Sequence, residues 1–118
     1  MPPTPAASPV LSIDVEHCSG GEVTVRCHGR LVAGATQILY APVRELIPTS
    51  RRIVLDLADL SHTDSTGLGT LARLYVAAKS AGCSLELMHL NKQIRNLLGL
   101  THMLDIFTVV GEKGIKWM

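Results

Sequence analysis

The sequence predicts an α/β fold with one mixed β-sheet, and three observations support this prediction. Two alternating segments, 10–15 and 23–27, flank the turn 19–21 and indicate an antiparallel N-terminal hairpin. An apolar strand at 53–57 is followed by a helical pattern and by a second strand at 84–90. Another helix and a last strand, 106–110, follow in turn. The two strand–helix–strand crossovers predict parallel strands, packed with three to four helices.

Three further segments lie in the first half of the chain: a tail, a loop and a helix whose start has two alternative interpretations. Residues 1–9 hold four of the six prolines and no charged side chain, which favours a disordered N-terminal tail. Residues 29–34, GRLVAG, are typical of a loop. Residues 35–47 carry an apolar helical face, with Ile38 among its members, but Pro42 interrupts it. Either this helix kinks at Pro42 or it begins near Tyr40, and Pro48 ends it.

The central strand leads into a cluster of short polar residues that favour turns and helix N-caps. These are Asp59, Ser61, Asp64, Ser65 and Thr66. We expect a tight polar turn there, followed by a long helical pattern that begins at Thr70 and ends at Gly82. A helix N-terminus presents free backbone N–H groups and a partial positive charge, so it suits a phosphate.

The last third of the chain predicts a strand, a helix and a strand. Leu85 and Leu87 alternate with polar neighbours, Asn91 is a suitable N-cap for a helix at 92–98, and Gly99 closes that helix. Residues 100–104 are expected to add a further helical turn.

Composition excludes several classes of function. The 118 residues suit one domain, and apolar residues, at 47%, suffice for a core. A net charge of +1 and 3% aromatic residues argue against nucleic-acid or membrane-surface binding. No apolar run reaches the ~18–20 residues of a membrane span, and no secretory signal is evident. The three scattered cysteines fit a reducing cytoplasm better than a disulfide framework.

The motif Asp-Ser-Thr-Gly-Leu-Gly at 64–69 stands in this strand–turn–helix context, with supporting segments at 53–57, 81–87 and 94–100. Together these segments resemble the STAS domain family (sulphate transporter and anti-sigma factor antagonist). The resemblance covers residues 10–118, which we expect to form a single STAS domain. With no transmembrane segment, the chain resembles the stand-alone bacterial anti-sigma factor antagonists.

The resemblance implies a phosphorylation switch. In these antagonists a partner that is both serine kinase and anti-sigma factor, of GHKL ATPase type, phosphorylates the second hydroxyl of the motif. That hydroxyl corresponds to Thr66 here, with Ser65 as second choice. Unmodified antagonist captures the partner and frees the sigma factor, and a phosphatase is a further possible partner. The implied partner-binding residues are Asp64, Ser65, Thr66, Gly67, Leu68, Gly69, Thr70, Arg73, Arg30 and Val32.

Two departures from the family pattern support a second hypothesis. Val32 stands where the antagonists usually carry an acidic residue, and the expected acceptor, Thr66, is not the commoner serine. Threonine occurs at this position in related scaffold proteins of stressosome type. The alternative is therefore a STAS scaffold or adaptor without direct control of a sigma factor.

Other interpretations of the same residues also stay open. Thr66 and Asp64 are ordinary helix-capping residues, so both are explained without any partner. Asp56 is expected to bond to an adjoining loop. The five histidines and three cysteines show no spacing typical of a metal site, and no nucleophile elbow or nucleotide fingerprint is present. We therefore expect no cofactor, no metal and no catalytic residue, and hence a protein that is not an enzyme.

Overall fold

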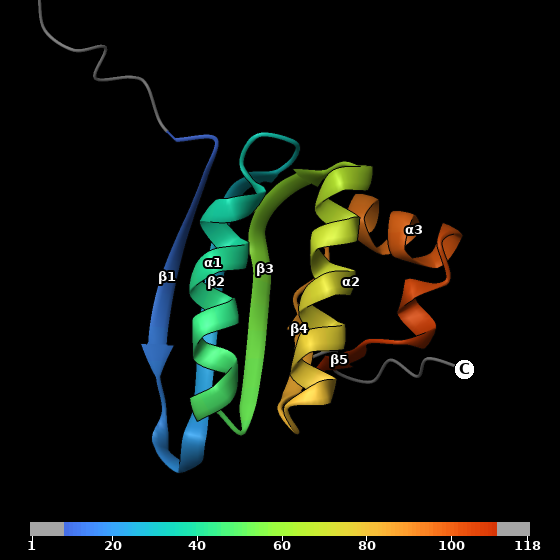
Figure 1. The fold of residues 1–118 in the computed structure, drawn as a ribbon. Helices are drawn as coiled ribbons and strands as arrows, with labels where there is room; N and C mark the ends of the chain where they lie inside the picture. Colours follow the sequence, from blue (N-terminus) through green and yellow to red (C-terminus); the bar gives the residue numbers. More distant parts are fainter. Residues whose placement is uncertain (1–8, 111–118) are drawn as a thin grey trace, which may run out of the picture.

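A single five-stranded sheet forms the centre of the structure, a computed structural model that describes residues 9–110 (Figure 1). Its strands are β1 (Leu11–His17), β2 (Glu22–Leu31), β3 (Arg52–Thr63), β4 (Ser84–Met88) and β5 (Thr108–Val110), in that spatial order. β1 pairs with β2 antiparallel, and the remaining neighbours pair parallel. The predicted mixed sheet with an N-terminal hairpin is therefore confirmed. The predicted N-terminal tail lies, but for Pro9, outside the described residues.

Three α-helices in the described part of the chain connect the parallel strands: α1 (Thr36–Leu46), α2 (Ser65–Ser80) and α3 (Lys92–Leu100). Short 3-10 turns stand at Ser19–Gly21, Ile47–Thr49 and Met103–Asp105. The sequence predicted two parallel crossovers, but the structure has three. The additional one runs from β2 through α1 to β3.

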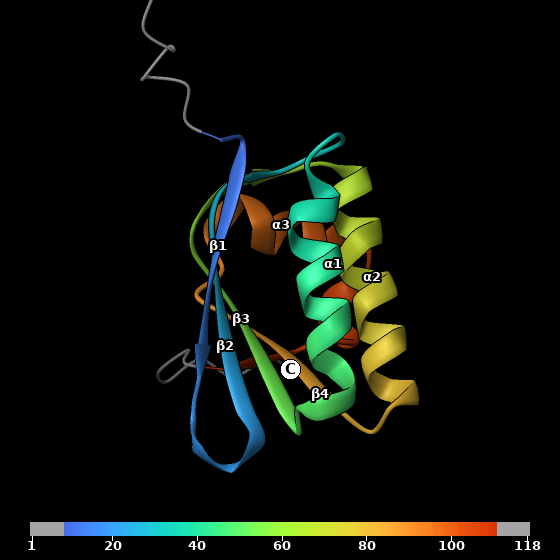
Figure 2. The same ribbon diagram turned by 60° about the vertical axis from the view of Figure 1, so that its left-hand side comes forward.

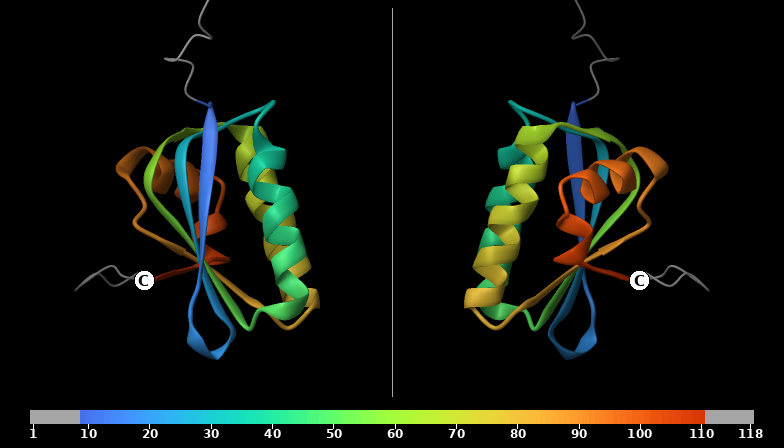
Figure 3. Two further views of the ribbon diagram at one scale, coloured as in Figure 1. Left: turned by 90° about the vertical axis from the view of Figure 1, so that its left-hand side faces the viewer. Right: turned by 90° about the vertical axis from the view of Figure 1, so that its right-hand side faces the viewer.

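The core lies between the sheet and the two helices α1 and α2, which run side by side over one face (Figures 2 and 3). Alternate residues of the strands, such as Val25, Leu55 and Leu87, point into it and are fully buried. Leu39 of α1 and Leu71 of α2 meet them from the helix layer. This burial fixes which faces of α1 and α2 stay exposed.

The central strands are longer than the sequence predicted. Residues 59–63, expected in a polar turn, belong to β3, and residues 29–31, expected in a loop, belong to β2. The two extensions pair with each other, with Gly29 opposite Leu60 and Leu31 opposite Thr63. In this extension of β3, Leu60 and Thr63 are buried, while Asp59 and Ser61 are exposed.

Of the two helices of the layer, α1 begins within one residue of the predicted residue 35, and α2 begins earlier than predicted. α1 is continuous from Thr36, so Pro42 lies inside it and the alternative start near Tyr40 is wrong. Ile38, expected on the buried face, is 42% exposed. α2 begins at Ser65 and not at Thr70, because the side chain of Asp64 caps it.

The carboxyl end of β3 is tied to α3. As predicted, Asn91 caps this helix, its Oδ1 accepting from the N–H of Ile94 at 2.8 Å. The amide Nδ2 of Asn91 also donates to the carbonyl oxygen of Leu60 at 2.8 Å. The expected strand 84–90 ends at Met88, and the last strand begins at Thr108, after the turn Met103–Asp105.

Contacts between histidine and aspartate side chains lie on the sheet face that points away from α1 and α2. His28 of β2 contacts a carboxylate on each side: its Nε2 lies 2.8 Å from Oδ2 of Asp14, and its Nδ1 lies 3.0 Å from Oδ2 of Asp59. Asp56, which is 8% exposed, accepts from the N–H of Ala58 at 3.0 Å and lies 2.9 Å from Nδ1 of His89. The expected structural role of Asp56 is confirmed.

Candidate functional site

Asp64 connects three segments at the N-terminus of α2. Its Oδ1 accepts from the backbone N–H of Gly67 at 2.8 Å, which is a helix N-cap. Its Oδ2 accepts from the N–H of Ala33 at 3.0 Å, in the loop between β2 and α1. These hydrogen bonds, that from Ala33 first, lower the pKa of the Asp64 carboxyl. A charged carboxylate therefore stands beside the first turn of α2.

Gly67 allows the helix to approach the sheet closely. A Cβ atom at this position would fall on the carbonyl oxygen of Leu31 and on Oγ1 of Thr63. The Thr63 hydroxyl is buried there and donates to the same Leu31 carbonyl at 2.7 Å. The first turn of α2 therefore packs directly on the ends of β2 and β3, which holds the motif rigidly.

The two hydroxyl groups of the motif face solvent. Ser65 and Thr66 are both exposed, and neither hydroxyl makes a hydrogen bond to any described residue. Gly69, one turn further, is also exposed and has open space around it. An exposed hydroxyl at the positive end of a helix, with no bond to break, is accessible to a modifying enzyme.

The structure brings most of the predicted partner-binding residues to this end of the fold. Arg30 is exposed on β2, opposite His62, and Val32 is half-buried in the loop next to Ala33. Three predicted residues do not present a side chain at the surface, because they pack against the sheet: Gly67, Leu68 and Thr70.

Thr70 in particular was expected on the exposed face of the helix, and this expectation is wrong. Its side chain is 2% exposed, and its hydroxyl donates to the carbonyl oxygen of Thr66 at 3.1 Å. Thr70 lies three residues after Gly67 and four before Leu74, both of which are buried, so it shares their inward face of α2.

A comparison with models of protein families identifies the family of this chain. The sequence model of the STAS domain matches residues 12–113. The chain belongs to the STAS domain family. Among curated proteins, the anti-sigma-B factor antagonist of Bacillus subtilis is 31% identical over 83 residues, which cover 66% of this chain and 76% of that protein.

Solved structures show the same fold. An anti-sigma factor antagonist from Mycobacterium paratuberculosis superposes with a TM-score of 0.76 at 18% identity, covering 87% of both chains. The Bacillus cell fate determinant SpoIIAA in its phosphorylated form superposes with a TM-score of 0.69 at 17% identity, covering 86% of this chain and 94% of that one. The predicted STAS fold is therefore confirmed.

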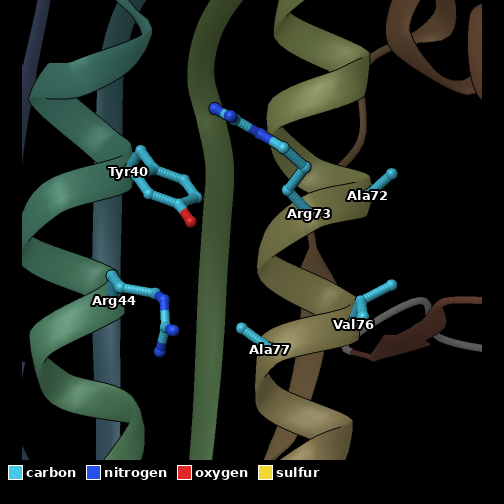
Figure 4. Close-up of a pocket in the computed structure, with 6 residues that line it drawn as sticks. All are labelled: Tyr40, Arg44, Ala72, Arg73, Val76 and Ala77. Atoms are coloured by element: carbon cyan, nitrogen blue, oxygen red, sulfur yellow. The ribbon is translucent and has the colours of Figure 1, made fainter.

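The exposed side of α2 in this STAS domain faces α1 across a shallow groove (Figure 4). Arg73 reaches toward α1, and its guanidinium carbon lies 4.5 Å from the centre of the Tyr40 ring, a cation–π contact. Arg44, one turn after Tyr40, lines the same groove. Tyr40 and Arg44 carry no sequence signal of a site, because only the packing of α1 against α2 places them beside Arg73.

The described part of this STAS domain offers little to bind a metal ion. No group of three or more candidate ligand side chains comes together among residues 9–110. Cys18, Cys27 and Cys83 are free thiols, and burial raises the pKa of Cys27 to about 12. None of the helices in this range has the length and apolar character needed to cross a membrane.

Proposed function

We propose that this STAS domain is an anti-sigma factor antagonist that captures its partner at the N-terminus of α2 and releases it when Thr66 is phosphorylated. The observation that carries the proposal is the exposed Thr66 hydroxyl, which has no hydrogen-bond partner among the described residues. The Bacillus relative named as an antagonist and the phosphorylated form of SpoIIAA support it.

The capture surface comprises the exposed residues around Thr66. Ser65 and Gly69 lie beside Thr66, Arg73 lies two turns along α2, and Arg30 lies at the end of β2. The Asp64 carboxylate holds the loop 32–35 against α2 through Ala33, so loop and helix form one rigid surface. A preorganised surface binds with a smaller loss of conformational entropy.

A phosphate at Thr66 would prevent docking without unfolding the domain. It adds about −1.5 to −2 charges to the second residue of α2, where the helix dipole tolerates negative charge. A partner packed over Thr66 would meet both this charge and the Asp64 carboxylate. A loss of ~3 kcal/mol in binding free energy would weaken the complex more than a hundredfold.

In this proposal the antagonist is not itself an enzyme. The partner is an anti-sigma factor that is also a serine kinase of GHKL ATPase type, and a phosphatase restores the unmodified state. Capture of the partner frees a sigma factor, so the domain controls transcription without touching DNA, in the cytoplasm. Ser65 is the second candidate acceptor.

The test combines modification and capture. Intact-mass and peptide mass spectrometry of the protein from its own cells should find a single added phosphate on Thr66. The variant Thr66→Glu should lose capture of the anti-sigma factor, while Ser65→Ala should retain it. Urea denaturation should give both variants a free energy of unfolding within about 0.5 kcal/mol of the wild type, because both positions are exposed.

The contrary result is equally clear. If Thr66 stays unmodified under growth and stress conditions, and Thr66→Glu still captures the partner, the phosphorylation switch is wrong. If the chain then binds signalling proteins other than an anti-sigma factor, that binding would favour a scaffold or adaptor. Val32, which replaces the acidic residue usual in the antagonists, favours the same alternative.

A further inference from the structure

The groove between α1 and α2 has a volume of about 460 Å³ and an unusual lining. Its lining is mostly apolar, with Ala72, Val76 and Ala77 from α2 and the ring of Tyr40 from α1. Val76 is 62% exposed, so part of this apolar surface is uncovered. Figure 4 shows Tyr40 and Arg44 on α1 pointing toward α2, and Arg73 reaching back toward α1.

The charge of the groove is positive and uncompensated. Arg44 and Arg73 both line it, and neither forms an ion pair with a carboxylate of the described residues. The helix α2 contains no acidic residue, and α1 contains only Glu45. The surface complementary to this groove is therefore one with apolar side chains flanked by carboxylates.

The groove is continuous with the surface around Thr66. Along α2, exposed Thr66, Gly69, Arg73 and Val76 recur at intervals of three or four residues, so they form one stripe on the helix. An occupant of the groove therefore lies along the same helix face as the Thr66 hydroxyl. A phosphate on Thr66 would repel an occupant that carries carboxylates.

We propose that this groove receives an acidic amphipathic helix of the partner, with a large apolar side chain placed between α1 and α2 and carboxylates paired with Arg44 and Arg73. The inference rests on the proposed function, because it assigns this helix to the anti-sigma factor. Binding of a helix by its apolar face in a groove is a common mode of recognition between proteins. The two arginines set the required charge of the partner.

The direct test uses a peptide probe and the full chain. The probe is an amphipathic peptide of about 18 residues, with leucines at helical spacing and glutamates beside them. Its control is the same peptide with lysines in place of the glutamates. Titration into isotope-labelled protein should shift the NMR signals of residues that line the groove, and only the acidic peptide should do so.

Variants then locate the contact. Arg44→Glu combined with Arg73→Glu should weaken binding of the acidic peptide roughly tenfold or more, because two attractive charge pairs become repulsive. Arg44→Glu alone should also weaken binding. Lys79→Glu is its matched control, since it reverses one charge on α2 outside the groove, and it should change the affinity less than about twofold. Urea unfolding confirms that each variant is folded.

Three results would overturn the inference: no saturable shift with the acidic peptide, equal binding of the lysine peptide, or self-association of the chain through the groove in sedimentation experiments. The proposed function is tested separately by capture of the anti-sigma factor. If Thr66→Glu abolishes capture but the double arginine variant does not, the proposed function stands and the groove assignment is wrong. If Thr66→Glu abolishes capture, Arg44→Glu alone weakens it and Lys79→Glu does not, both stand.

Discussion

Two glycines in the first turns of α2 have opposite surroundings. Gly67 faces the ends of β2 and β3, where a Cβ atom would overlap the Leu31 carbonyl and the Thr63 hydroxyl. Gly69 has nothing within 4 Å of the same position. Only Gly67 is therefore required for close packing of the helix on the sheet. Gly69 instead leaves the exposed helix surface beside Thr66 without a side chain.

We therefore expect Gly67→Ala to lower the free energy of unfolding by about 1–3 kcal/mol, through overpacking against backbone and a buried hydroxyl. Gly69→Ala should instead raise it by about 0.5–1 kcal/mol, because alanine is the better helix former and no atom opposes it. Urea denaturation of both variants measures this difference in sign. A stabilised Gly67→Ala variant would contradict the close packing described here.

At the scale of elements, His28 joins three strands at once. It lies on β2, where the pairing with β3 shifts register between Arg26 and His28, and its ring contacts Asp14 of β1 and Asp59 of β3. The hydrogen bond to Asp14, then the charge of Asp14 and the hydrogen bond and charge of Asp59, raise the pKa of His28 against the opposing effect of burial. The protonated imidazole can donate to both carboxylates.

The sign of the resulting pH dependence follows from this raised pKa. The stabilisation by charged His28 should be fully present below the unfolded-state pKa of about 6.5, and it should be lost as the pH rises through the higher pKa of the folded state. Urea midpoints of the wild type should therefore fall between pH 6 and 8 relative to His28→Gln. Parallel curves for the two proteins would show that the His28 contacts contribute nothing.

At the scale of the whole molecule, β3 is the central strand and carries the core. Leu55 is fully buried between β2 and β4, beneath the layer of α1 and α2. Leu100, at the end of α3, is 78% exposed. The two leucines therefore allow the same chemical change to be made inside and outside the core.

Leu55→Ala should lower the free energy of unfolding by about 2–5 kcal/mol, because it leaves a cavity in the core. Leu100→Ala, the matched control, should change it by less than about 0.5 kcal/mol. Chemical denaturation followed by circular dichroism gives both values. Similar losses for the two variants would mean that the buried face of β3 is not the centre of the core.

Sequence patterns predicted the helices and strands well where one face of an element is apolar. These patterns failed where pairing or packing with a distant part of the sequence determines the structure of a segment. Residues 59–63 of β3 carry turn-forming side chains, and they are extended because residues 28–31 of β2 pair with them. Likewise, local pattern offered both Asp64 and Thr66 as caps, and only the packing of α2 on the sheet shows that Thr70 is buried with Gly67 and Leu74.

The sequence by itself determined the α/β class, the hairpin, the family and the position of Thr66 near a helix N-terminus, because these depend on local periodicity and on one contiguous motif. Only the tertiary structure decided which residues share a surface. It set the parallel pairing of β2 with β3 and the contact of Arg73 with Tyr40, which are 33 residues apart in the chain. Such contacts arise from the packing of whole elements, and no local pattern in the sequence records them.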